Sequence, residues 1–166
     1  MIQAKHLNLV KKIFDYCAKY NLKISVAESC TGGLLATYFT YLPGSSEFFD
    51  KAIVSYSNNA KIDLFNIPKG ILESYSAVSF EVAILMAQNL NSNQDNYLSI
   101  ATTGLLGPND DGSGKPVGLI YIAVNIGNES LRVKELMLKG DRHDIQEQVI
   151  DHVLNLAIES LVYAQE

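Results

Sequence analysis

A serine and a run of small residues stand where a predicted strand gives way to a predicted helix. Residues 23–27 have the composition of a short strand and Leu34–Tyr41 that of a helix, so residues 29–33 form the turn between them. The first turn of a helix leaves backbone N–H groups unpaired, and glycine lets a ligand approach the backbone closely. The turn therefore predicts an anion-binding site, or alternatively a helix start capped by Ser29 or Thr31.

A tyrosine and a lysine follow the next predicted strand, residues 51–56. Tyr56 ends this strand, and Lys61 lies in a short helix predicted over residues 59–65 with Asn58 as its cap. A lysine with its ordinary pKa of about 10.4 is protonated at neutral pH. Burial or a nearby positive charge lowers that pKa and frees the amine to take a proton from a serine hydroxyl. The pair is a candidate for serine–lysine chemistry, and an exposed lysine on a surface helix is the alternative.

Cys30 is another candidate nucleophile, because the start of a helix lowers the pKa of a thiol. Its alternative is a small buried side chain, the usual state of a free cysteine, and we favour this interpretation.

Arg142 opens the last predicted helix and suits bidentate contact with phosphate or carboxylate, with a surface ion pair as the alternative. Asp110 and Asp111 are expected to be solvated.

The predicted elements are those of an α/β fold with a mixed, mostly parallel sheet of about five strands and helices on both faces. Further strands are predicted over residues 97–103, 119–125 and 131–138, the last two as a hairpin around Gly127-Asn128. Between the third strand and the hairpin lies a Gly- and Pro-rich loop of residues 104–118, a length more often functional than idle. Ligands bind such sheets outside the carboxyl ends of the parallel strands, where Ser29 and Thr103 stand.

Length, composition and charge are those of a globular protein. The 166 residues fit one domain over residues 1–166, with 48% apolar and 19% charged residues. A net charge of -5 argues against general affinity for nucleic acid. No secretory signal is found, and no apolar run approaches the roughly 18 residues that span a bilayer. We expect a cytoplasmic protein that binds neither membrane nor nucleic acid.

The histidines lack metal-ligand spacing, so we also expect no metal and no cofactor.

Seven short motifs occur in an order that resembles the CinA C-terminal domain family. Each motif is weak alone, but their order over residues 27–142 is specific. They are Ala27-Glu28-Ser29-Cys30-Thr31-Gly32-Gly33, Pro43-Gly44-Ser45-Ser46, Val54-Ser55-Tyr56-Ser57-Asn58 with Lys61, Ala77-Val78-Ser79, Thr103-Gly104-Leu105-Leu106-Gly107-Pro108, Lys115-Pro116-Val117-Gly118 and Gly140-Asp141-Arg142. Leu106 departs from the alanine usual in the family, and the loop after Pro108 is less glycine-rich, which bears on substrate fit.

The resemblance implies a three-layer α/β/α sandwich that hydrolyses the carboxamide of nicotinamide mononucleotide to nicotinate mononucleotide and ammonia. It assigns the nucleophile to Ser46, the base to Lys61 and an assisting role to Tyr56. The remaining matched positions are interpreted as substrate-binding: Ser29, Thr31, Gly32, Gly33, Ser45, Thr103, Gly104 and Arg142. The expected partner is a pyridine mononucleotide, and we expect a homo-oligomer, at least a dimer. A non-catalytic nucleotide-binding module of the same family is the alternative function.

One difficulty concerns the distance between Ser46 and Lys61. A right-handed crossover places Ser46 near the amino end of the second strand, while Lys61 follows its carboxyl end, about 20 Å away for six residues. Either the chain around Ser46 folds back across the sheet edge, or Ser46 meets a Lys61 of another subunit. Ser29 fits the predicted topology better as nucleophile and is kept as the alternative.

Overall fold

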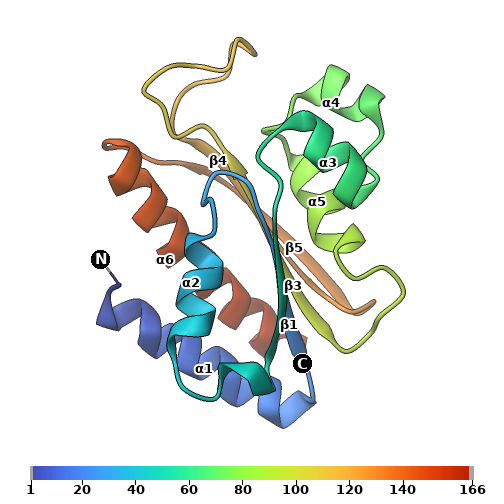
Figure 1. Cartoon of the computed structure of the whole chain (residues 1–166), viewed down its shortest axis with the longest axis vertical. Coiled ribbons are helices and arrows are strands. Elements are labelled where there is room, and N and C mark those ends of the chain that lie inside the picture. The colour runs from blue at the N-terminus through green and yellow to red at the C-terminus, as the bar shows by residue number, and fades with distance from the viewer. Residues whose placement is uncertain (1, 165–166) are drawn as a thin grey trace.

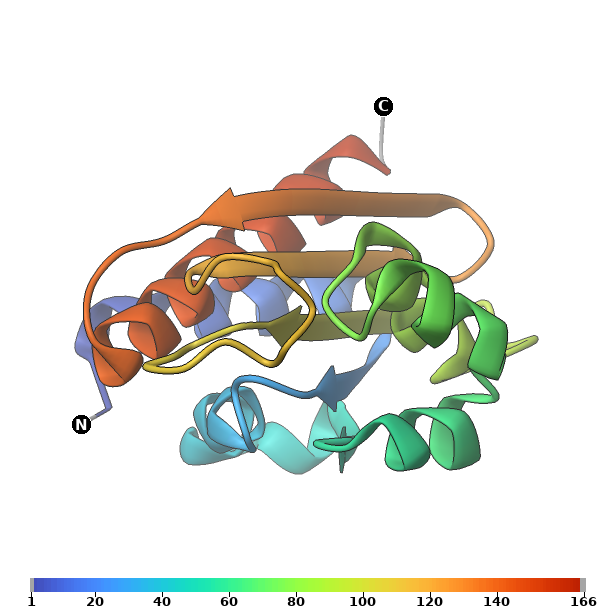
Figure 2. The same cartoon turned by 90° about the horizontal axis from the view of Figure 1, so that it is seen from above.

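One five-stranded sheet forms the centre of the computed structural model, which describes residues 2–164 (Figure 1). Its order is β2-β1-β3-β4-β5, which Figure 2 displays from bottom to top. The strands are β1 (Lys23–Glu28), β2 (Phe49–Val54), β3 (Tyr97–Gly104), β4 (Leu119–Ile126) and β5 (Ser130–Met137). β1 pairs in parallel with β2 and β3, whereas β4 and β5 continue the sheet in antiparallel pairs. The predicted mixed sheet of five strands is confirmed.

Helices cover both faces of the sheet, as the three-layer sandwich requires (Figure 1). One layer holds α1 (Ala4–Tyr20), α2 (Leu34–Tyr41) and α6 (Arg142–Tyr163), and the other holds α3 (Asn58–Phe65), α4 (Lys69–Tyr75) and α5 (Phe80–Asn89). Each layer shares its own apolar core with one face of the sheet. Within residues 2–164, no helix combines the length and the apolar character needed to cross a membrane.

The two faces of the sheet differ in side-chain size. Branched side chains such as Ile24 and Ile100 point toward α1 and α6. The opposite face carries a row of small residues in register, Ala27 beside Ala101 beside Ala123, which all belong to the core shared with α5. Small side chains let a helix lie close to a sheet without leaving a void. Because α5 packs on this face, the segment before it, residues 76–79, lies beside the carboxyl end of β3, where the Thr103 hydroxyl donates to the carbonyl oxygen of Ala77.

Several local predictions are corrected by the structure. Ser57, not Asn58, caps α3, because its side chain accepts the N–H of Ala60. A 3-10 helix, η1 (Ser45–Glu47), and helix α4 were not predicted. Pro68 is the N-cap of α4, a place where proline is well tolerated because the first N–H groups of a helix have no partner within it.

Glu28, the last residue of β1, is fully buried and binds the start of α2. Its carboxylate accepts hydrogen bonds from the backbone N–H groups of Gly33, Leu35 and Ala36 at 2.8–3.1 Å. The first N–H groups of a helix lack partners in the helix itself, and the helix dipole favours a negative charge there. Glu28 therefore stabilises the helix start and holds the turn that carries Ser29 against the sheet.

We predict that Glu28→Gln lowers the free energy of unfolding by about 2–3 kcal/mol. The amide NH2 of glutamine faces N–H groups that need an acceptor, so at least one buried donor loses its partner. Urea denaturation measures the change. Glu73→Gln is the matched control, because Glu73 lies in an exposed pair with Lys69 and should change stability by less than about 0.5 kcal/mol. Equal effects of the two substitutions would contradict this role of Glu28.

Candidate active site

Lys61 of α3 and Ser29, which directly follows β1, are in hydrogen-bond contact. Nζ of Lys61 donates to Oγ of Ser29 at 3.0 Å and to the carbonyl oxygen of Ser55 at 2.7 Å. The lysine is 1% exposed and the serine 8%. Burial lowers the pKa of Lys61 to about 8, because the charged amine loses its hydration. At pH 7 about a tenth of the amine is thus neutral beside a serine hydroxyl, far more than in a lysine with the ordinary pKa.

The carboxyl ends of β1, β2 and β3 position this pair. Ser29 donates its N–H to the carbonyl oxygen of Thr102 in β3, and Ser55 donates its N–H to the carbonyl oxygen of Glu28. The hydroxyls of Thr31 and Thr102 share a hydrogen bond of 2.8 Å that ties the turn after β1 to β3. β1 lies between its two parallel neighbours, and β2 and β3 leave it in opposite directions across the sheet. This reversal of strand order marks the place where ligands bind in open α/β sheets.

A cavity of about 260 Å³ opens above Ser29 and Lys61. Six of the residues predicted for the site line it, namely Ser29, Tyr56, Lys61, Thr103, Gly104 and Arg142. The rest of the lining comes from the loop after β3 and from three other segments, namely Leu105, Leu106, Gly107, Asn109 and Asp111, with Cys30, Asn58, Ala77 and Val78. The structure thus brings together, at one end of the sheet, predicted residues from four distant parts of the chain.

The polar groups at the rim are held by one another. Arg142 donates through Nη1 to the carbonyl oxygen of Gly107 at 2.8 Å and through Nη2 to the hydroxyl of Tyr56 at 2.7 Å. Tyr56 is 64% exposed and is bound to this arginine rather than to Lys61. Thr103 donates its hydroxyl proton to the carbonyl oxygen of Ala77 at 2.7 Å. Its side chain can therefore accept from a ligand but has no proton left to donate.

The start of α2, for which the sequence predicts an anion site or a capped helix start, has its N–H groups occupied within the protein. The N–H groups of that turn already bind the Glu28 carboxylate, whose negative charge would repel a phosphate. Gly32 and Gly33 have positive φ angles of 59° and 99°, which glycine adopts without strain, so they serve the path of the backbone. Neither glycine nor Thr31 lines the cavity.

Ser45 and Ser46 lie at the opposite end of the sheet from Lys61. Both belong to η1, directly before β2, and Lys23 at the start of β1 donates to the carbonyl oxygen of Glu47 at 2.6 Å. Lys61 follows the other end of β2, so about 20 Å of strand separates it from Ser46. The segment does not fold back across the sheet edge, and only a second subunit could bring a Ser46 to this Lys61.

Some residues of the site carried no clear signal in the sequence. Ser55 contributes a main-chain carbonyl, which no side-chain pattern reveals. Asp111, predicted to be solvated only, is exposed but lines the cavity. The structure favours the buried interpretation of Cys30, because it is 5% exposed and burial raises the pKa of its thiol to about 12.

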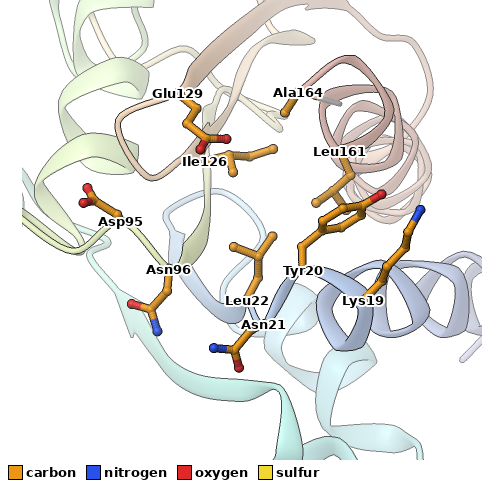
Figure 3. Close-up of a pocket in the computed structure, with 10 residues that line it drawn as sticks. All are labelled: Lys19, Tyr20, Asn21, Leu22, Asp95, Asn96, Ile126, Glu129, Leu161 and Ala164. Atoms are coloured by element: carbon orange, nitrogen blue, oxygen red, sulfur yellow. The ribbon is translucent and has the colours of Figure 1, made fainter. Parts of the chain in front are cut away.

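A larger cavity of about 680 Å³ lies at the amino ends of β1 and β3 (Figure 3). Figure 3 shows Tyr20, Leu22 and Leu161 on one side, and the carboxylates of Asp95 and Glu129 on the other. Among the described residues that line it there is no serine, threonine or cysteine. It lacks a nucleophile beside a base, so its greater volume does not make it the better candidate for catalysis.

Comparison with known proteins identifies the family. A family model of the CinA C-terminal domain matches residues 6–161. The chain belongs to this family. A CinA-like protein of Fusobacterium nucleatum is 46% identical over 133 residues, which cover 80% of this chain and 32% of that protein. A CinA-like protein of Dictyoglomus thermophilum is 41% identical over 139 residues, covering 84% and 34%. The chain thus spans about a third of the length of the curated relatives it matches.

Solved structures of CinA proteins share the fold. The crystal structure of the competence/damage inducible protein CihA from Agrobacterium tumefaciens matches with a TM-score of 0.90 and 29% identity, covering 100% of this chain and 99% of that chain. A CinA superfamily protein from Escherichia coli matches with a TM-score of 0.86 and 27% identity, covering 95% and 94%. The names of these relatives refer to competence and damage induction and state no reaction.

The burial of Lys61 predicts a specific dependence of stability on pH. Its pKa falls from 10.5 to about 8 on folding, so between these values the unfolded chain binds more protons than the folded one and stability rises with pH. Lys61→Met lacks this contribution. The free energy of unfolding of the parent chain should therefore rise relative to that of Lys61→Met by up to about 3 kcal/mol between pH 7 and pH 10.5. Chemical denaturation at several pH values measures the difference, and a constant difference would contradict the lowered pKa.

Proposed function

We propose that this CinA domain hydrolyses a carboxamide with Ser29 as nucleophile and Lys61 as general base. The observation that carries the proposal is the 3.0 Å contact between Nζ of Lys61 and Oγ of Ser29 in a buried setting. The hydrogen bond to the Ser55 carbonyl oxygen holds the amine in place. A serine activated by a neutral lysine is an established alternative to the serine–histidine pair.

The proposed reaction has two halves. Oγ of Ser29 forms a bond to the amide carbon while its proton moves to Nζ of Lys61, and the carbon–nitrogen bond then breaks as the lysine returns that proton to departing ammonia. In the second half, Lys61 takes a proton from water, the resulting hydroxide attacks the acyl ester, and the proton returns to Ser29 as the acid leaves. No other reactant is required.

The oxyanion of the intermediate needs hydrogen-bond donors. The Thr103 hydroxyl does not serve, because its proton is donated to Ala77. In strand–turn–helix nucleophile sites, the N–H of the residue after the nucleophile fills this role. Here that residue is Cys30, whose N–H contacts its own sulfur and donates to no other residue of the described chain. We therefore assign the Cys30 backbone, not its thiol, to the stabilisation of the oxyanion.

The proposed substrate is nicotinamide mononucleotide, as the family resemblance implies. Its phosphate would bind Arg142, which keeps guanidinium donors beyond the two that bind Gly107 and Tyr56. The cavity of about 260 Å³ lies at the small end of ligand pockets, which favours a mononucleotide over a dinucleotide.

Ser29→Ala should reduce ammonia release from nicotinamide mononucleotide by at least about 10³-fold, because the nucleophile is lost. Ser46→Ala is the matched control and should retain activity within about twofold, since an exposed serine far from the cavity contributes little to stability. Ammonia release by the purified proteins is measured, and thermal unfolding checks that each variant folds.

The reverse result, with Ser46→Ala inactive and Ser29→Ala active, would instead support a site shared between subunits. A parent chain that is stabilised by the nucleotide but never hydrolyses it would support the binding module.

On the acid side, the pH dependence of kcat/KM should follow the deprotonation of Lys61. Only the neutral amine accepts a proton, so kcat/KM should rise tenfold per pH unit below a midpoint of about 8 and level off above it. Steady-state kinetics between about pH 6 and pH 9.5 measure this limb. A profile that is flat over this range would be incompatible with Lys61 as the base.

A further inference from the structure

The cavity above Ser29 has charged groups of opposite sign at its rim. Arg142 supplies the positive charge and Asp111 the negative one, and Lys61 is the remaining charged residue among those that line it. Arg142 comes from the start of α6, whereas Asp111 lies in the loop between β3 and β4. A ligand that fills this cavity therefore meets a donor of hydrogen bonds on one part of the rim and an acceptor on another.

Asp111 is held in place by its own loop. Its Oδ1 accepts the backbone N–H and the hydroxyl of Ser113, while Oδ2 accepts no hydrogen bond from residues 2–164. Burial opposes ionisation of Asp111, but the hydrogen bonds from Ser113 and the charge of Lys115 outweigh it, so the pKa of the carboxyl lies below its ordinary value. The side chain is thus an anion at neutral pH with one oxygen available.

The loop itself is fastened to the opposite side of the cavity. Nζ of Lys115 donates to the carbonyl oxygen of Tyr75, the last residue of α4, and to that of Val78 in the segment between α4 and α5. Thr103 binds Ala77 of the same segment. These contacts join the loop to the wall that α5 holds against the sheet, so Asp111 occupies a defined place at the rim.

An ionised carboxylate only accepts hydrogen bonds, so its ligand must present donors. In the proposed function a ribosylated carboxamide that carries a phosphate places its amide at Ser29 and its phosphate at Arg142, and the sugar between these two groups bears two adjacent hydroxyls. Carboxylates bind ribose hydroxyls in this way in dinucleotide-binding folds. We propose that Asp111 binds the ribose hydroxyls of the substrate and so selects ribosylated over deoxyribosylated amides. This inference rests on the proposed function and names its substrate class.

Asp111→Asn tests the inference, with Asp110→Asn as the matched control. Asparagine keeps an oxygen for Ser113 and replaces only the second oxygen by a donor. Asp110 binds the N–H of Gly112 in the same loop but does not line the cavity. The probes are nicotinamide mononucleotide and its 2′-deoxy analogue, and kcat/KM is measured for both.

The parent chain and Asp110→Asn should prefer the ribosylated probe by about tenfold or more, and Asp111→Asn should reduce this preference to near unity. The loss should lie in KM with kcat little changed, because the contact is equal in ground and transition states. A parent chain without preference, or an Asp111→Asn variant that keeps it, would overturn the inference.

Calorimetric binding of the two probes separates this inference from the proposed function. If the parent chain binds nicotinamide mononucleotide without releasing ammonia, the proposed function fails. The inference then still stands if the 2′-deoxy analogue binds at least about tenfold more weakly and Asp111→Asn removes the difference. Equal binding of both probes by an active parent chain overturns the inference alone.

Discussion

The site depends on the burial of one amine. A charged lysine without water is costly, and here burial lowers its pKa to about 8 instead of being offset by a carboxylate. The two oxygens that Nζ contacts, from Ser29 and Ser55, are both uncharged. Because neither restores the ordinary pKa, the uncharged fraction of the Lys61 amine at a given pH is far larger than that of an exposed lysine. The surrounding elements are arranged to keep water away from it: α3 carries it inward, and the ends of β1 and β2 supply its partners.

The other buried charge, Glu28, lies one residue before Ser29 and acts on the backbone. It binds three N–H groups at the start of α2, so these groups are not available to bind a substrate anion. This leaves Arg142 as the cation at the rim of the cavity that can bind a substrate phosphate. The proposed orientation, with the amide at Ser29 and the phosphate at Arg142, follows from this division of roles. In this proposal the carboxylate of Asp111, which also lines the cavity, binds the part of the ligand between them.

The sequence predicted much of the fold and the core of the site. Apolar periodicity located five strands, and the rule that ligands gather at the carboxyl ends of parallel strands brought Ser29 and Lys61 to one place. The same rule favoured Ser29 over Ser46, against the motif-based assignment. Side-chain directions at the rim could not be predicted, because they are set by contacts between distant segments. Lys115 binding Tyr75 and Val78 is one example, and Thr103 turning its proton toward Ala77 is another. The role of Glu28 could not be predicted either, because its three N–H partners are brought to it by the path of the turn after β1.

The central claim is that the amine of Lys61 is neutral at a pH where other lysines are charged. Labelling lysine at 13Cε and following its chemical shift through a pH titration measures this directly, with Lys61→Met used to assign the signal. The account predicts a midpoint of about 8 for Lys61. A midpoint near the ordinary lysine value of about 10.4 would contradict it, because the amine could then not accept the proton of Ser29.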